Sequence, residues 1–488
     1  MAKKEQLFSL IQSLTQAEKR YFKIFCFSQK VDNNYLKLFE LMVKQVDYDE
    51  EKIRKKFKGE RFLKQLHVTK NYLYQLLLKS LRNYHSTISA DAEIKSLLRN
   101  VEILFVRELY EASFSELRKV EKLATKFENQ TALLEIINWK KKFQLTKSGT
   151  DVESLQELIA KEKKIIEGIV LQNENWELTS DVFRFFKSNK KRLEIFLQKK
   201  PPPNASLQHQ ILFYNLDYIF HVINGEPKKG LASLDLMIDL FERNPARIKD
   251  DPSSYARVMN NKVSYFIFQK QYIHVLPLLK KIRAIPTTYQ LKNAQKFSIK
   301  LQLRTYNIEL EMYRDLKQFE KGINVISQAK RYLLENEKII PADYHVMLRY
   351  QFAYIYFMQK NYSNSLKWVN EIIQTPFKNY RKDLQSYARV LNLMIHFELG
   401  NIIVLKYAVE NCRRFLKKSI DFRGQPTVLP FAKVLLHFFS KICNAPHSHY
   451  SQLFEKLKMD LVDAEPQILN DDILDYLDIK SWLVEKLK

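Results

Sequence analysis

The chain has 488 residues, of which 46% are hydrophobic and 13% aromatic, enough apolar side chains for an extensive core. Only 8 residues are glycine. Because tight β-hairpins need positive φ, which glycine adopts most readily, this content excludes most strand-rich folds. Lys and Arg total 80 against 55 Asp and Glu, which gives a net charge of +25 and favours anionic partners such as nucleic acid, acidic peptides or anionic lipid.

The positive charge is uneven along the chain. Residues 1–82 contain 18 basic and 9 acidic residues, residues 83–450 contain 57 and 37, and residues 451–488 contain 5 and 9. Per residue, the first segment is about twice as basic as the second, whereas the last segment is acidic. The N-terminal segment is therefore the part most suited to a polyanionic partner.

Cysteine and hydropathy patterns indicate where the protein resides. Cys26, Cys412 and Cys443 are far apart and lie in or beside apolar stretches, as is typical of reduced core thiols. The N-terminus turns polar too soon for a signal peptide, and the most apolar run contains Lys433. We therefore expect a cytoplasmic protein without membrane insertion.

Residues 1–88 predict a basic head made of short helices. The expected helices are Lys3–Leu14, a second one opened by the capping box Thr15-x-x-Glu18, Asn34–Gln45, Glu50–Phe57 and Thr69–Tyr84. Residues 89–200 predict helical hairpins and then a long helix at Val152–Leu171. Proline cannot continue a helix, so Pro201–Pro203, preceded by the basic run Lys187 to Arg192, predicts a linker or a sharp bend.

Residues 205–425 predict a repeat of paired helices. The turns between the helices contain pivot residues whose spacings are 45, 47, 43 and 40, namely Pro227, Tyr272, Phe319, Tyr362 and Ile402. Near-constant spacing of this kind indicates stacked two-helix units.

The fourth unit carries the clearest pattern. Its residues Phe352, Ala353, Tyr356, Tyr362, Ser365, Val369, Ile372 and Pro376 fall where tetratricopeptide repeats place their signature residues, so the chain resembles a tetratricopeptide-repeat protein. The pattern departs from the family in three ways: the period is longer, Lys270 and Lys360 replace the turn glycine, and Ile282 and Ile372 replace a small residue. The whole chain also resembles uncharacterised helical-repeat proteins of Bacteroidota, which implies no function.

This resemblance implies an all-α fold: a right-handed α-solenoid of tetratricopeptide-like hairpins that follows a small helical head. Residues 426–488 predict three capping helices. The last one is expected to begin near Asp471 and Asp472 and to end near Lys486 and Lys488, in agreement with the helix dipole.

No catalytic, cofactor or metal motif is found. Gly225 and Gly230 have P-loop spacing, but Leu231 and Ala232 stand where Lys and Ser or Thr must contact phosphate and magnesium. The close pair His447 and His449 lacks neighbouring carboxylates for a zinc site. We therefore expect no cofactor and no metal, and an enzyme remains only as a third functional class without a motif to support it.

One pair of residues recurs on the first helix of successive units. Arginine and asparagine stand three residues apart, and so share a helix face, in three places: Arg257/Asn260, Arg304/Asn307 and Arg389/Asn392. Arginine binds carboxylates in a bidentate manner and asparagine bonds peptide backbone, so the row predicts a groove for an acidic or extended peptide. The alternative is structural: asparagine bonds a neighbouring helix, and arginine is solvated or paired within the chain. Counted from the turn, Arg389 comes two positions later than Arg257.

The fourth unit interrupts this row with apolar residues. Tyr350, Tyr354 and Phe357 replace the polar pair on the equivalent face. They predict either an apolar pocket for a partner's anchor residue or simply core between units, and core is the preferred interpretation.

The head resembles a helix-turn-helix in layout. Its recognition helix would begin after His67–Thr69 and present Lys70, Asn71, Tyr74 and Gln75 to a groove, with the basic residues between Arg54 and Lys64 on phosphates. The alternative is an amphipathic helix that packs through Leu73, Leu76 and Leu77 and leaves a solvated charged face.

These patterns favour a non-catalytic adaptor that presents a basic concave groove to a protein or peptide. The alternative is a nucleic-acid-associated regulator that binds through its head, with the solenoid as sensor or assembly surface.

Overall fold

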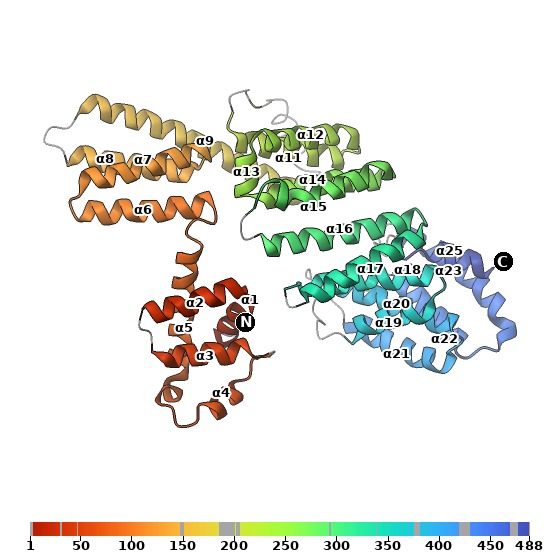
Figure 1. Ribbon diagram of the computed structural model, residues 1–488. Coiled ribbons are helices and arrows are strands. Elements are labelled where there is room, and N and C mark those ends of the chain that lie inside the picture. Colours follow the sequence, from red (N-terminus) through yellow and green to blue (C-terminus); the bar gives the residue numbers. More distant parts are fainter. Residues whose placement is uncertain are drawn as a thin grey trace. The chain divides into compact units, whose positions relative to one another are not determined.

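A computed structural model describes residues 3–29, 32–45, 47–146, 151–184, 201, 205–291, 294–337, 339–374, 381–418, 430–468 and 477–487. In these ranges the chain forms helices and no β-strand (Figure 1), which confirms the all-α fold class. Two compact units are present: residues 1–262 with 289–293, and residues 263–288 with 294–488. The four-part domain division and the handedness of the solenoid stay predictions.

The first unit begins with the head. Its helices are α1 (Lys3–Ser13), α2 (Gln16–Ser28), α3 (Asn33–Val43), α4 (Glu50–Lys56), the 3₁₀ helix η1 (Arg61–Gln65) and α5 (Leu66–Tyr84). The predicted capping box is confirmed, because the Glu18 amide donates to Thr15 Oγ1 at 3.2 Å and the Thr15 amide donates to Glu18 Oε2 at 2.6 Å. Phe22, Phe39 and Leu73 are fully buried at the centre of an apolar core that belongs to the head alone.

Helical hairpins form the rest of the first unit. These helices are α6 (Ala90–Val106), α7 (Tyr110–Lys126), α8 (Gln130–Leu145), α9 (Val152–Arg184), α11 (Leu207–Ile223), α12 (Pro227–Arg243), α13 (Pro245–Asp250) and α14 (Pro252–Phe268), the last of which continues into the second unit. Glu128, in the turn before α8, accepts hydrogen bonds from the amides of Leu207 and Gln208 and so caps α11.

The second unit stacks further hairpins. Its helices are η2 (Tyr272–His274), α15 (Val275–Thr288), α16 (Gln295–Asp315), α17 (Phe319–Asn336), α18 (Ala342–Met358), α19 (Tyr362–Ile373), α20 (Lys382–Glu398), α21 (Ile402–Lys418), α22 (Pro430–Ile442), η3 (His447–His449), α23 (Tyr450–Ile468) and α25 (Ile479–Lys486). The first helices α16, α18, α20 and α22 contact one another in that order, and each also contacts its own second helix. This is the packing of a solenoid.

The predicted pivots mark the helix boundaries. The helix after each turn begins at the pivot itself: α12 at Pro227, η2 at Tyr272, α17 at Phe319, α19 at Tyr362 and α21 at Ile402. The repeat spacing read from the sequence is therefore confirmed.

These five turns share one backbone geometry with the turns before α7 and α8. The residue two positions before the next helix has a left-handed φ of 52° to 74°: Glu108, Glu128, Gly225, Lys270, Lys317, Lys360 and Gly400. The next amide in each turn bonds the carbonyl five residues earlier, as in Asn361 to Tyr356 at 2.9 Å. This is the Schellman ending, in which glycine is favoured because a side chain is strained there.

A small residue lies three positions after the pivot in several hairpins. Ser113 and Ser365 donate to the carbonyls of Val101 and Ala353, in each case at 2.7 Å and across the hairpin. At the equivalent Gly230, a Cβ atom would lie 3.3 Å from the Tyr218 carbonyl oxygen. A large side chain at this position would force the two helices apart.

Some predicted boundaries are corrected. The long helix α9 extends to Arg184 rather than ending at Leu171, since no proline interrupts it. His67–Thr69 lie inside α5 rather than capping it, because η1 runs directly into the helix and the Thr69 hydroxyl bonds the Gln65 carbonyl. Several predicted features lie outside the described residues: the basic run Lys187 to Arg192, Pro202 and Pro203, Pro376, Asp471, Asp472 and Lys488.

Replacing a strained turn lysine by glycine is expected to stabilise the protein. Lys270 and Lys317 are exposed, and no described residue forms an ion pair with either of them. Lys270→Gly and Lys317→Gly should each raise the free energy of unfolding by about 0.5–1 kcal/mol, measured by chemical denaturation, because glycine tolerates positive φ. The control Lys300→Gly, within α16, should lower it by about 1 kcal/mol. Equal effects at the turns and at Lys300 would contradict this account.

Candidate functional site

The first arginine and asparagine pair lies on α14. Arg257 is exposed, and its guanidinium donates to Ser254 Oγ at 3.1 Å. Asn260 is only 4% exposed, and its amide nitrogen donates to the Ala256 carbonyl at 2.6 Å. Its side-chain oxygen is buried and has no hydrogen-bond partner among the described residues. The pair therefore combines an exposed cation with an acceptor that is buried and unsatisfied.

The second pair repeats this arrangement on α16. Arg304 is exposed and forms no ion pair with any described residue. Burial raises the pKa of the Tyr344 hydroxyl on α18, and the nearby positive charge of Arg304 partly offsets this rise. The side-chain oxygen of the half-buried Asn307 again has no partner in the described part of the chain.

Equivalent positions relate the two pairs. Each arginine stands 15 residues before its pivot and each asparagine 12 residues before it, counted to Tyr272 or Phe319. The α14 pair belongs to the first unit and the α16 pair to the second. Each helix therefore presents the same chemistry within its own unit.

The third pair does not continue the row. Arg389 stands 13 residues before Ile402, and this shift of two positions turns its side chain by about 200° around the helix axis. The guanidinium carbon lies 3.5 Å from the Phe415 ring centroid on α21, and the group donates to the Gln385 carbonyl at 2.9 Å. Burial lowers the Arg389 pKa to about 10. The structure thus corrects the sequence prediction and places Arg389 against the second helix of its own hairpin.

Its companion Asn392 is also enclosed. The residue is 9% exposed, and its side-chain oxygen has no described partner. Without an accessible arginine one turn away, this amide lacks the cation that would attract a carboxylate.

The apolar residues of α18 form core. Tyr350, Tyr354 and Phe357 are 1%, 3% and 4% exposed, so none of them opens to solvent as a pocket. The Tyr354 hydroxyl accepts a hydrogen bond from the Asp478 amide at 3.1 Å. The preferred sequence interpretation, core, matches these exposures.

The chain's own C-terminal segment covers part of the first-helix surface, a feature that sequence reasoning missed. Trp482 Nε1 donates to Glu398 Oε1 at 2.6 Å, and Lys486 Nζ donates to Glu398 Oε2 at 2.7 Å. Tyr354 and Glu398 stand 8 and 4 residues before their pivots, near the turn ends of α18 and α20. The amphipathic stretch around Trp482 was the available signal, but nothing in the sequence identified the surface it packs on.

In the head, Lys70 is buried and bonded to two other side chains of the head. It is 7% exposed, and its ammonium group donates to Glu50 Oε2 and to the Tyr48 hydroxyl, each at 2.8 Å. The hydrogen bond from Lys70 is the main cause that lowers the Glu50 pKa to about 2. The predicted contact of Lys70 with nucleic acid is therefore corrected, because this side chain ties α5 to α4.

The other predicted head residues differ in accessibility. Asn71 and Gln75 are exposed, one turn apart on α5, whereas Tyr74 is half-buried against the head core. The burial of Leu73, Leu76 and Leu77 agrees with the amphipathic interpretation of this helix. The helix thus packs on one face and leaves Asn71 and Gln75 on the other.

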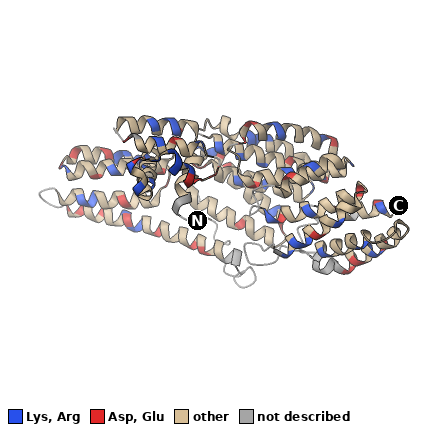
Figure 2. Cartoon of the chain, turned by 90° about the horizontal axis from the view of Figure 1, so that it is seen from below, with Lys and Arg blue, Asp and Glu red and all other residues tan. Residues whose placement is uncertain are grey.

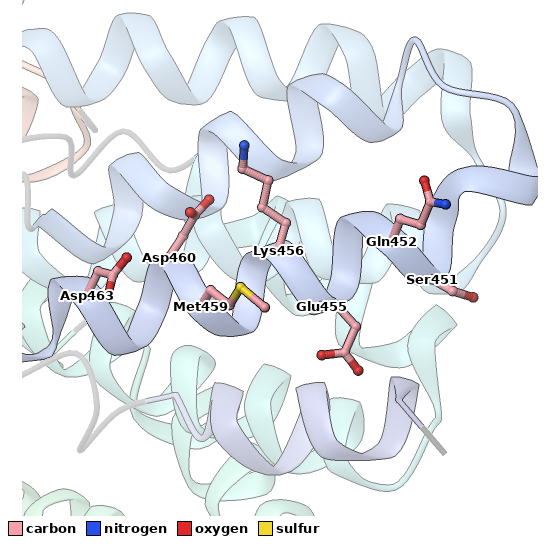
Figure 3. Close-up of a pocket in the computed structure, with 7 residues that line it drawn as sticks. All are labelled: Ser451, Gln452, Glu455, Lys456, Met459, Asp460 and Asp463. Carbon is pink, nitrogen blue, oxygen red and sulfur yellow. The ribbon is translucent and has the colours of Figure 1, made fainter.

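One pocket lies along a single helix and shows no convergent chemistry. Ser451, Gln452, Glu455, Lys456, Met459, Asp460 and Asp463 line this pocket (Figure 3). All of them come from α23 and spread along the helix, so they surround no common point. Among the described residues, no three His, Cys, Asp or Glu side chains are grouped to hold a metal ion.

Comparison with known proteins gives little further information. No protein-family model matches the sequence, and no curated protein matches it. Among solved structures, the chain is similar to a signal transduction ATPase with numerous domains that has a tetratricopeptide repeat sensor, from Pyrococcus horikoshii. The two share 15% identity with a TM-score of 0.37, over 88% of this chain and 55% of the other, so the chain spans about half that protein's length. The resemblance to proteins of Bacteroidota stays a prediction.

None of the described helices is both long enough and apolar enough to cross a membrane.

The ion pair of Glu50 and Lys70 predicts an acid-sensitive head. Because the folded pKa of Glu50 is lowered from 4.5 to about 2, the pair's contribution to stability should be complete above about pH 4.5 and be lost as the pH falls toward 2. Hydrogen exchange of the α4 and α5 amides, corrected for intrinsic rates, should show earlier opening at pH 3 than at pH 6. Glu50→Gln should open the head at pH 6 and change little at pH 2, whereas the exposed neighbour variant Glu51→Gln should resemble the parent protein at both.

Removing Trp482 is expected to destabilise the second unit. The side chain is 5% exposed and packs against Phe397, Phe439 and Phe454, so Trp482→Ala should lower the free energy of unfolding by about 3–5 kcal/mol. Val484→Ala, at a residue 56% exposed on the same helix, should change it by less than about 0.5 kcal/mol. Chemical denaturation followed by circular dichroism measures both, and equal effects would refute the anchoring role of Trp482.

Proposed function

We propose that the chain is a non-catalytic adaptor in which α14 and α16 each bind an acidic, extended peptide segment within their own unit. The supporting observation is the repeated pair on α14 and α16. Each helix combines an exposed arginine with an asparagine oxygen that no described residue satisfies. Because this oxygen is buried, a peptide cannot reach it, and the exposed arginine of each pair carries the proposal.

The chemistry of the pair selects the ligand class. Arginine offers a planar fork of donors that matches a carboxylate. An extended acidic segment presents such carboxylates. The exposed Arg257 and Arg304 would bind them, whereas Asn260 and Asn307 hold their side-chain oxygens below the surface.

The proposed peptide-binding surface does not continue onto the later first helices α18 and α20. There α18 and α20 present buried aromatic residues, and α25 packs against their turn ends. Arg389 also points away from the row. The proposed binding residues are therefore restricted to α14 and α16. Nucleic-acid binding by the head, the alternative from the sequence, uses a separate surface and does not compete with this proposal.

Titration with model peptides tests the proposal. The probe is a fluorescein-labelled decapeptide of alternating Glu and Ala, compared by fluorescence anisotropy with the same peptide carrying Gln for Glu. The acidic peptide should bind more tightly. Arg257→Ala with Arg304→Ala should weaken its binding about tenfold or more, because a charge-assisted hydrogen bond contributes about 1.5–3 kcal/mol.

Matched control variants distinguish binding by Arg257 and Arg304 from a general effect of positive charge. Arg107→Ala with Arg243→Ala removes two other exposed arginines and should leave the affinity within about twofold. Arg389→Met should likewise retain peptide binding, since this side chain is enclosed by Phe415. Equal loss in the Arg257/Arg304 and Arg107/Arg243 variants, or no preference for the acidic peptide, would refute the proposed site.

A further inference from the structure

The head exposes an unusually dense group of cations. Within 13 residues, α4, the following turn and η1 carry the basic strip: Lys52, Arg54, Lys55, Lys56, Lys58, Arg61 and Lys64, all of them exposed. The one acidic residue inside this stretch, Glu60, lies 3.7 Å from Lys37. Blue ribbon is correspondingly prominent near the N-terminal label in Figure 2. The strip is thus a strong local source of positive potential.

Helix α5 contributes a second exposed surface without negative charge. Its 19 residues include no Asp or Glu. The α5 face turned away from the head core consists of exposed residues at helical spacing: Val68, Asn71, Tyr72, Gln75, Lys79 and Arg82. Helix α5 therefore contributes no acidic side chain that would repel an anionic ligand.

The ion pair described above holds these two surfaces together. The Glu50 carboxylate accepts from Lys70 of α5 and from Arg54 of α4, each at 2.8 Å. At the other end of the strip, η1 continues into α5 without an intervening loop. The basic strip therefore borders the first turns of α5, where Asn71 and Gln75 are exposed.

We propose that the head binds double-stranded DNA, with the α5 face in the major groove and the basic strip on the flanking phosphates. A major groove about 12 Å wide admits one α-helix, whereas the deep, narrow major groove of double-stranded RNA does not. Asn71 and Gln75 carry the amide groups that bond adenine edges, and Val68 suits contact with a thymine methyl group. Lys70 acts indirectly, as the residue that positions α5 against α4.

This activity is independent of the proposed peptide binding. It uses α4, η1 and α5, whereas the peptide proposal uses α14 and α16. A protein with both would be a DNA-binding adaptor, and each activity can fail without the other.

Anisotropy titration of the full chain tests the inference. The probes are a fluorescein-labelled 24-base-pair DNA duplex of mixed sequence, the same single strand, and the RNA duplex of equal length, at 50–250 mM KCl. The DNA duplex should bind most tightly. Because each phosphate contact contributes about 0.9 to the slope of log K against log salt, Lys55→Gln, Lys56→Gln and Lys58→Gln together should reduce this slope by about 2–3. The same triple variant should weaken binding at 100 mM KCl by about tenfold or more.

A matched triple variant controls for net charge. Lys161, Lys163 and Lys164 are exposed lysines of α9, and their replacement by Gln should leave duplex binding within about twofold. The double variant Arg257→Ala with Arg304→Ala should also retain duplex binding. Loss of DNA binding and loss of peptide binding can therefore be told apart. If the α4 triple variant loses helical signal by circular dichroism, Lys64→Gln with Lys79→Gln provides a second test and should reduce the salt slope by about 1–2.

Several results would overturn the proposal. They are the absence of duplex binding at 50 mM KCl, equal weakening by the α4 and α9 triple variants, and tighter binding of single-stranded DNA or duplex RNA than of duplex DNA. Asn71→Ala with Gln75→Ala should narrow the affinity difference between adenine-rich and guanine-rich duplexes. Unchanged discrimination in that variant would contradict the placement of the α5 face in the groove.

Discussion

Each hairpin depends on one backbone constraint: the chain must reverse within three residues between two helices that then lie in close contact. The left-handed residue before Asn361, and its equivalents in the other turns, allow this reversal. Ser365 then bonds the carbonyl of Ala353 across the hairpin, so the small residue and the turn act together. Lysine or glutamate at several left-handed positions shows that packing of the paired helices outweighs the local strain.

Much of the fold could be read from the sequence because this constraint has a local signature. Pivot spacing, small residues and the Thr15 capping box depend on neighbours within about a dozen residues, and each of these predicted the helix boundary or cap that is observed. The length of α9 was underestimated because residues beyond Leu171 carry no strong helix signal yet also no helix breaker.

The candidate sites were less predictable because side-chain partners are set by distant segments. Arg389 shares its motif with Arg257, but two extra positions turn it toward Phe415. Lys70 shares a predicted groove face with Asn71, yet Glu50 and Tyr48, some 20 residues earlier, remove it from solvent. Sequence spacing fixes which face of a helix a residue lies on, whereas only the packed structure shows what covers that face.

The C-terminal helix α25 packs on several hairpins at once, and this limits where further hairpins could be inserted in the chain. Trp482 contacts Phe397 of α20, Phe439 of α22 and Phe454 of α23, and Asp478 bonds Tyr354 of α18. If a hairpin were duplicated within α18–α23, the helices that Trp482 and Asp478 contact would lie farther apart. The C-terminal segment could then no longer contact all of them at the same time. A hairpin duplicated before α16 would leave them together. We therefore expect an added hairpin to be tolerated on the N-terminal side of this closure, which is also where the exposed Arg257 and Arg304 occur.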